Sequence, residues 1–198
     1  EKDILEICEN KLKDLEKMNL KVENLNPKIN TDILWKSWIT LRSKSIYEDT
    51  LNMNISDISS MTFQAIWEFN KGKEIKSEDL QLAIDQKQKC LNQTNIIFES
   101  FDFLALPSAQ IFPFDKNLQF PKKINDIELD TYHRWLEVFI LSSLLELPTI
   151  TIPAGFNKDG MPMGIQLIGK NKDDLRLFSF AIKYEEAFNF SKIKPKLD

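Results

Sequence analysis

The pattern of apolar and polar residues near the end of the chain predicts two strands. Residues 149–152 alternate threonine and isoleucine, all β-branched, and the flanking Pro148 and Pro153 predict a short strand because proline donates no ladder hydrogen bond. A turn over residues 157–160 and a second apolar run at 165–168 follow. Because both runs are mostly apolar on both faces, we expect them inside a sheet covered by helices on two sides, not in a half-exposed hairpin.

The first seventy residues are mainly helical in pattern. Residues 3–18 place an apolar stripe on one face of an amphipathic surface helix. Val22 and Leu25 predict a short strand stopped by Pro27, after which Asn30 or Thr31 caps a helix that directs Leu34, Trp38 and Leu41 inward.

Two further helices are predicted before residue 102. One starts at Ser56–Asp57 and ends at Gly72 in a left-handed cap. The other is capped by Ser77, carries acids in its first turn and extends to about Phe101. It leads into a buried strand over residues 103–106, which must stop at Pro107.

The second half continues with a long connection and two helices. Residues 108–127 predict either a functional loop beside a pocket or an extended surface arm. Asp130 or Thr131 then starts a buried helix that reaches Leu145. Asn171 with Asp174 predicts a capping box for the last helix, whose inward stripe we expect to comprise Leu175, Phe178, Ala181, Ile182 and Phe188. Residues 191–198 form a polar tail, and a possible domain subdivision lies near residues 71–76.

Three segments together resemble a known enzyme family. The segment from Leu147 to Gly169 reads LPTITIPAGFNKDGMPMGIQLIG, residues 103–108 read FLALPS, and residues 130–135 read DTYHRW. They are similar, in this order and at compatible spacing, to the C-terminal block of the amidase signature family of serine hydrolases. The matching positions of the first segment are Pro148, Pro153, Ala154, Gly155, Pro162, Gly164, Gln166 and Gly169.

The resemblance implies both a fold and a reaction. It covers residues 102–188 well and the first hundred residues loosely. It implies an α/β fold in which parallel-leaning strands join a larger mixed β-sheet flanked by helices, with residues 1–198 as the C-terminal half of an amidase domain. The implied chemistry is hydrolysis of a carboxamide C–N bond through a serine acyl-enzyme, assisted by a lysine and a second serine.

The catalytic machinery that the resemblance implies is not found in this sequence. Family members carry the nucleophilic serine in a Gly-Gly-Ser-Ser-Gly-Gly-like loop. No two of the five glycines here are adjacent, and the serine pairs Ser59–Ser60 and Ser142–Ser143 lie in helical patterns. We therefore assign no catalytic residue to this chain, expect it to be inactive alone, and expect its partner to be an N-terminal half that bears the nucleophile. The start at Glu1 adds to the expectation of a truncated or processed piece.

Five residues are predicted to form substrate-pocket walls. Ser108 follows the strand-ending proline, and Gln110 and Phe112 offer an amide and an apolar surface for an acyl group. Tyr132 can line the same cleft from the helix side, and Gly155 lets the backbone approach the missing serine loop closely. The alternatives are a purely structural strand exit at Ser108 and a strand-end bulge at Gly155.

The neighbours of Tyr132 have competing interpretations. Arg134 and Trp135 can line the same cleft, although a plain salt bridge is the simpler role for Arg134. His133, the only histidine, invites a catalytic triad, but a solvated or capped residue in the first turn of a helix is the simpler prediction.

Composition narrows the classes of partner that we expect for this chain. The net charge is −4, and 3 of the 26 basic residues are arginine, which disfavours a nucleic-acid surface. One histidine and two distant cysteines predict no metal site, and no cofactor is expected. Without a long apolar run we expect no membrane contact, and two reduced thiols indicate a cytoplasmic protein.

Three functions stay open from the sequence. A small-molecule amidase with a small carboxamide substrate is favoured over the A subunit of a glutamine-dependent tRNA amidotransferase, since that branch usually has an Asp-rich stretch with Met-Tyr-Leu where this chain has residues 131–135. The third is a noncatalytic binding or assembly domain on the same scaffold. A homodimer is possible, and the 14 Phe and 4 Trp predict exposed apolar patches if a missing half normally covers them.

Overall fold

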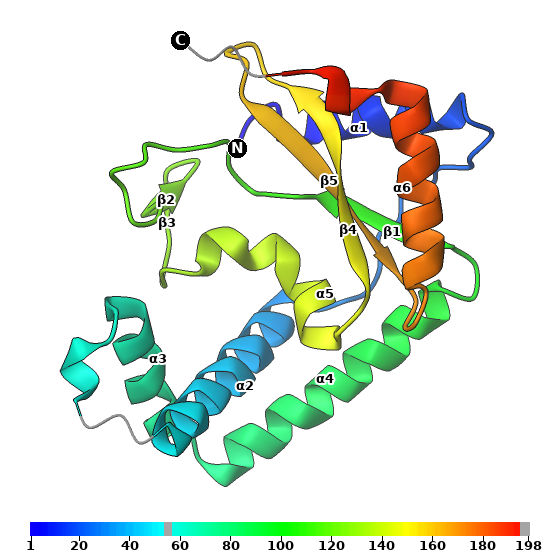
Figure 1. Cartoon of the computed structure of the whole chain (residues 1–198). Helices are drawn as coiled ribbons and strands as arrows, with labels where there is room; N and C mark the ends of the chain where they lie inside the picture. Colours follow the sequence, from blue (N-terminus) through cyan, green and yellow to red (C-terminus); the bar gives the residue numbers. More distant parts are fainter. Residues whose placement is uncertain (54–56, 195–198) are drawn as a thin grey trace. The chain divides into compact units, whose positions relative to one another are not determined.

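The chain folds into two compact units. The computed structural model describes residues 1–53 and 57–194, and we refer to the units as unit 1 (Glu1–Asn26 with Phe98–Asp198) and unit 2 (Pro27–Ile97). Figure 1 shows unit 1 as a small sheet with helices and unit 2 as a group of helices.

The boundaries of the units differ from the subdivision expected near residues 71–76. That segment lies inside unit 2, where α3 (Phe63–Glu74) ends and α4 (Ser77–Ile97) begins. The pattern at this place marks a turn between two helices, because Ile75 and Lys76 leave the helical conformation before Ser77 starts the next helix.

The sheet of unit 1 has three strands in the order β1-β5-β4. They are β1 (Phe103–Pro107), β4 (Thr149–Phe156) and β5 (Pro162–Gly169), and both pairs are antiparallel. The expected parallel lean is therefore wrong for these strands. The turn between β4 and β5 is too short for the crossover that parallel strands need, so the two strands form a hairpin.

Strand β4 is longer and more exposed than its sequence predicts. It continues through Pro153, with a bulge between Pro153 and Gly155. Proline is tolerated because β4 is an edge strand of the described sheet. Thr149 and Thr151 are exposed while Ile152 is buried, so β4 has the half-exposed character that the sequence did not suggest. The central strand β5 is buried along nearly its whole length, as expected.

Helices cover both faces of the sheet, as predicted. On one face, α1 (Ile4–Glu16) and α6 (Asp174–Phe188) pack on β4 and β5 (Figure 1). On the other face lie the 3-10 helix η2 (Arg134–Phe139) and α5 (Ile140–Leu145). The single helix expected from residue 130 is thus two short helices. The buried core between the sheet, α1 and α6 comprises Ile4, Cys8, Leu15, Ile152, Ala154, Met163, Ile165, Leu167, Leu177 and Tyr184.

The inward face of α6 was predicted in part wrongly. Leu177 and Tyr184 are its buried residues, whereas Leu175, Phe178 and Ile182 are 81%, 61% and 61% exposed. Both stripes are apolar at helical spacing, so periodicity alone could not decide which one meets the sheet. The N-cap is Asp173 without a side-chain hydrogen bond, so the capping box expected from Asn171 does not form.

The connection after β1 holds a small hairpin. Strands β2 (Lys123–Ile124) and β3 (Ile127–Glu128) pair across Asn125 and Asp126, both with positive φ. Asparagine and aspartate tolerate this conformation well. Residues 108–122 remain a loop, and the polar tail begins as a 3-10 helix, η3 (Phe190–Lys192), while residues 195–198 lie outside the described part.

Unit 2 is helical. It contains α2 (Thr31–Asn52), η1 (Ile58–Ser60), α3 and α4. The side chain of Asn30 accepts a hydrogen bond from Ile33 N, which confirms one of the two predicted caps, and Ser77 is the first helical residue of α4. The strand expected around Val22 is absent from residues 20–30, and α4 ends at Ile97.

The segment before α3 and the C-terminal part of α3 both differ from the prediction. Ser56 lies outside the described residues, Asp57 caps η1, and Thr62 caps α3 after a break at Met61. Gly72 is not a left-handed cap: it is buried inside α3, where a Cβ would lie 2.1 Å from the backbone oxygen of Ser43 in α2. Its missing side chain allows close helix packing.

Candidate functional site

The candidate site is a groove of unit 1 where β1 ends beside the start of β5. Ser108 directly follows β1, and its backbone N–H donates to the carbonyl of Gly164 at 2.9 Å. A Cβ on residue 164 would lie 2.8 Å from Ser108 Oγ and 3.0 Å from the carbonyl oxygen of Ile152. Glycine at this position therefore leaves room for the Ser108 hydroxyl over the sheet.

The groove has a volume of about 610 Å³. Its aromatic wall comprises Phe112, Phe114 and Trp135, and two hydroxyl-bearing residues, Ser108 and Thr151, also line it. The remaining lining residues are Ala109, Ile111, Pro113, Ile152, Pro153, Pro162, Met163 and Gly164. An apolar concave surface with a few polar groups is the usual form of a small-molecule site.

A buried glutamine connects the elements that bear the two walls. Gln166 of β5 is fully buried, and its Nε2 donates to the carbonyls of Pro107 at 3.0 Å and Val138 at 2.9 Å. Its Oε1 accepts from Ser142 Oγ at 3.5 Å. Because Pro107 ends β1 and Val138 lies in η2, this one side chain fixes the strand that precedes Ser108 and the helix that carries Trp135.

The helical wall is held by ion pairs on its outer side. Arg134 binds Asp130 and Glu137, each at 3.0 Å. Partial burial acts to lower the pKa of the Arg134 guanidinium, but the two carboxylates outweigh it and raise that pKa. Next to it, Trp135 meets Phe114 edge to face with ring centroids 5.4 Å apart. Arg134 is thus a structural ion pair, as the simpler prediction had it.

The structure brings two of the five predicted wall residues into the groove. Ser108 and Phe112 line it. Gln110 does not, because its Oε1 accepts from Val138 N at 3.0 Å and so holds η2. Tyr132 packs near Phe120 and is not among the lining residues. Gly155 also lies outside the lining set, with φ +152° after the bulge of β4.

The groove also contains residues that sequence reasoning did not select. The sequence named Trp135 as a residue that can line the cleft but not among the five predicted wall residues; it assigned Thr151 to a strand without a site role and gave Met163 no role. Thr151 could have been found from its hydroxyl on the exposed face of β4. Met163 carries no local signal, since its place in the groove depends on the bulged pairing of β5 with β4, in which it lies opposite Gly155.

His133 lies in the core of unit 1. It is 1% exposed, and its Nδ1 lies 3.3 Å from Thr131 Oγ1. Of the two expected alternatives, the solvated ring is therefore wrong, and the side chain makes no capping hydrogen bond at the start of η2. The side chain is not among the groove-lining residues, so it offers no general base there.

A thiol lies directly beneath the groove. Cys8 of α1 is buried, and its Sγ lies 3.6 Å from the Gly164 carbonyl that also accepts from Ser108. Burial, and secondarily the charge of Glu9, raise the pKa of the Cys8 thiol to about 11. It is therefore protonated at neutral pH and acts as a core residue.

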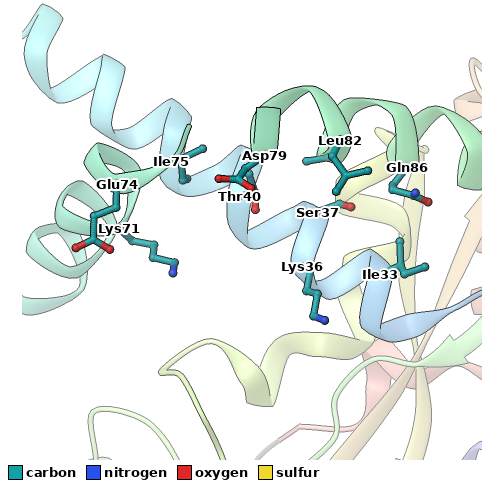
Figure 2. A pocket seen from close by; sticks show the side chains of 11 residues that line it. Ile33, Lys36, Ser37, Thr40, Lys71, Glu74, Ile75, Asp79, Leu82 and Gln86 are labelled. Atoms are coloured by element: carbon teal, nitrogen blue, oxygen red, sulfur yellow. The ribbon is translucent and has the colours of Figure 1, made fainter. Parts of the chain in front are cut away.

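Unit 2 has a second hollow of about 610 Å³. Figure 2 shows its side chains, which come from α2, the end of α3 and α4. Lys36, Lys71, Glu74 and Asp79 give it both signs of charge. No residue predicted to bind substrate lies in this hollow.

Neither a metal cluster nor a membrane-spanning helix occurs in the described residues. Residues 1–53 and 57–194 contain no group of three or more His, Cys, Asp or Glu placed to hold a metal ion. In the same ranges, no helix combines the length and the apolar character needed to cross a bilayer.

Comparison with known structures shows the fold. A bacterial aryl acylamidase of the amidase signature enzymes superposes with a TM-score of 0.85 and 18% identity, over 97% of this chain and 41% of that one. The A subunit of the glutamyl-tRNA(Gln) amidotransferase of Thermotoga maritima superposes with a TM-score of 0.67 and 23% identity, over 94% and 39%.

Sequence comparison identifies relatives and the family. The A subunit of the glutamyl-tRNA(Gln) amidotransferase of Thermodesulfovibrio yellowstonii is 35% identical over 101 residues, 50% of this chain and 19% of that protein. Its counterpart in Shouchella clausii is 47% identical over 55 residues, 28% and 11%. The alignments thus span no more than about a fifth of these relatives. A family model described as Amidase matches residues 1–178, and the chain belongs to the amidase family and has its hydrolase fold.

Proposed function

We propose that this chain supplies one wall of the substrate pocket of an enzyme that cleaves a carboxamide C–N bond through a serine acyl-enzyme. The observation that carries the proposal is the groove at the end of β1, where Ser108 and an aromatic wall meet in a chain of the amidase family. Such a groove holds an acyl group by apolar contact, and its hydroxyls orient the amide by hydrogen bonds.

The same groove explains why we propose that the chain alone is inactive. A serine or threonine hydroxyl becomes a useful nucleophile only with a base within hydrogen-bond reach. The lining residues include no ionisable side chain, and Ser108 Oγ lies against the thioether of Met163 at 4.0 Å. The nucleophile and its lysine-linked base would come from a segment outside residues 1–198.

The open edge of β4 is the place where we propose that this segment adds to the sheet. Gly169 N donates to the carbonyl of Pro148, so the backbone of Pro148 faces β5. Because hydrogen-bonded positions recur at every second residue of an antiparallel strand, the backbone groups of Ile150 also face β5. The N–H and C=O groups of Thr149 and Thr151 then point away from β5, toward the edge. Residues 149–156 carry no charged side chain to protect this edge, as natural free edges usually do.

The first test compares the chain with the protein encoded by the complete reading frame. The purified chain is expected to release no benzoate or ammonia from benzamide, and the longer protein is expected to do so. In the longer protein, Ser108→Ala is expected to raise KM more than it lowers kcat. Hydrolysis of benzamide by residues 1–198 alone would contradict the proposal that the nucleophile lies outside this chain. A longer protein that contains neither a Ser-Ser-Gly loop nor the lysine would favour a noncatalytic binding domain.

A second measurement addresses the edge. Amide hydrogen exchange is expected to be fast at Thr149 and Thr151 in the isolated chain and slow in the longer protein, with Ile150 protected in both. If the isolated chain protects Thr149 and Thr151 and light scattering shows a dimer, a second copy occupies the edge and the proposed partner is wrong.

The A subunit of a tRNA amidotransferase is the second candidate, because the curated relatives named above are such subunits. It shares the proposed amide chemistry and differs in substrate and partners. Copurification with a second type of chain, together with amidation of glutamyl-tRNA, would favour it.

We also propose that the protein is cytoplasmic. Both of its cysteines are free and buried, as is usual in a reducing compartment.

A further inference from the structure

The groove of unit 1 differs from an ordinary surface depression in its lack of charge. All of its lining side chains are aromatic, aliphatic, proline, glycine, thioether or hydroxyl. In a chain of which 28% of the residues are charged, the hollow of similar size in unit 2 is lined by four charged side chains. The uncharged lining is therefore a property of this site.

Charged residues close to the lining residues in sequence are bound elsewhere. Arg134, next to Trp135, is held by Asp130 and Glu137. Asp115, next to Phe114, accepts from the backbone and side chain of Asn117. None of these charged residues is among the lining residues.

The side chain of Glu1 also lies nearby with its charge engaged. The Glu1 carboxylate accepts from Phe112 N at 2.8 Å. This contact is to the backbone of the loop, and Glu1 is not among the lining residues.

An uncharged wall discriminates between acyl groups. A carboxylate or ammonium group that contacts this wall loses hydration and finds no counter-charge among the residues that line it, which is costly. An apolar group instead removes both its own surface and that of Phe112, Phe114 and Trp135 from water, which is favourable. The edge-to-face contact of Phe114 with Trp135 fixes two of these rings in place.

We infer that this groove takes the uncharged, apolar acyl part of a carboxamide, aryl or aliphatic, with Trp135 as a specificity-determining residue, and excludes acyl parts that carry charge. This inference rests on the proposed function and narrows its substrate class. Glutamine, whose acyl part carries an α-carboxylate and an α-ammonium group, is excluded.

Ligand binding to the chain tests the inference without any need for catalysis. In ¹H–¹⁵N spectra, benzamide is expected to shift the amides of Ser108 and Gly164 and the indole N–H of Trp135. L-Glutamine at the same concentration is expected to leave them unchanged. Trp135 is the one tryptophan of unit 1, so its indole signal is separable from those of unit 2 by mutation. Shifts by glutamine at these positions, or no shifts by benzamide at millimolar concentration, would overturn the inference.

Variants assign the effect to the aromatic wall. Trp135 is half-buried, and Trp135→Ala is expected to weaken benzamide binding roughly tenfold or more, since aromatic side chains that a bound partner shields from water contribute most to such contacts. Trp135→Phe is expected to retain most of the binding and guards against loss of the fold. Phe178→Ala, an exposed aromatic of α6 outside the groove, is the matched control and should bind as the parent does. Equal binding by all three variants would contradict the role of Trp135.

Activity of the longer protein separates this inference from the proposed function. Hydrolysis of benzamide with a higher kcat/KM than that of glutamine supports both. A preference for glutamine overturns the inference and leaves the proposed amidase function intact. Benzamide binding at the groove without hydrolysis of any amide supports the inference and overturns the function.

Discussion

The two hollows of this protein have similar volumes and different construction. The groove of unit 1 is built at the ends of strands, where backbone pairing and the buried Gln166 fix its walls, and no charged side chain lines it. The hollow of unit 2 lies among three helices and is lined by two lysines and two acids. Hollows of equal volume in this chain therefore differ in chemistry: the groove of unit 1 has an uncharged lining fixed by strand pairing, and the hollow of unit 2 has a charged lining carried by helices.

The largest effect is expected from a substitution that disrupts the close packing of α3 on α2, beside the unit 2 hollow. Gly72→Ala would place a Cβ 2.1 Å from Ser43 O and 2.6 Å from Tyr47 Cβ, so α3 must move away from α2. We expect a loss of about 3 kcal/mol or more in the free energy of unfolding, although glycine to alanine in a helix usually stabilises. Urea unfolding with residue-resolved hydrogen exchange measures it, and the amides of α2 and α3 should lose protection first.

The matched variant in unit 1 sharpens the comparison. Gly164→Ala meets Ser108 Oγ at 2.8 Å, a side chain that can rotate, and the carbonyl of Ile152 at 3.0 Å. It should perturb β1, β4 and β5 and reduce benzamide binding while leaving α2 and α3 protected. A Gly72→Ala protein that is as stable as the parent would show that the helices of unit 2 pack less closely than described.

The second effect is expected from a substitution of the side chain that connects the walls of the groove. Gln166→Leu keeps a side chain of similar size but leaves the carbonyls of Pro107 and Val138 without their donor. Since buried unpaired polar groups are costly, we expect a loss of about 2 kcal/mol. Thermal unfolding measures the loss, and Gln81→Leu, at an exposed position of α4, is the control. Equal effects of both variants would show that Gln166 does not organise the groove.

The third effect, similar in size to that of Gln166→Leu, depends on pH. The folded Cys8 thiol has its pKa raised from 9.0 to about 11, mainly by burial, so the unfolded chain releases this proton first. The stabilisation is therefore complete below pH 9 and is lost as pH rises toward 11, by on the order of 2 kcal/mol. The measurement compares wild type with Cys8→Ala in urea from about pH 7 to 11. Parallel pH profiles of the two proteins would contradict the prediction.

The sequence predicted which segments form the groove more accurately than which of their side chains line it. Pro107 predicted the strand end that presents Ser108, and the apolar loop after it predicted Phe112, and both line the groove. Gln110 and Tyr132 do not line the groove, because the direction of a side chain in an irregular segment depends on contacts such as the bond from Val138 N to Gln110. No local pattern contains that contact.

What the sequence by itself determined is the three strands of the main sheet, most of the helices and the family. β-Branched runs, helical stripes and caps such as Asn30 are local properties, and the ordered motifs of residues 103–169 are matched by the amidase model. Only the tertiary structure decided which apolar stripe of α6 meets the sheet, that Gly72 serves helix packing, and that Thr151 and Trp135 face one groove. The reason is that each of these depends on which surface another segment covers, and local spacing allows more than one answer.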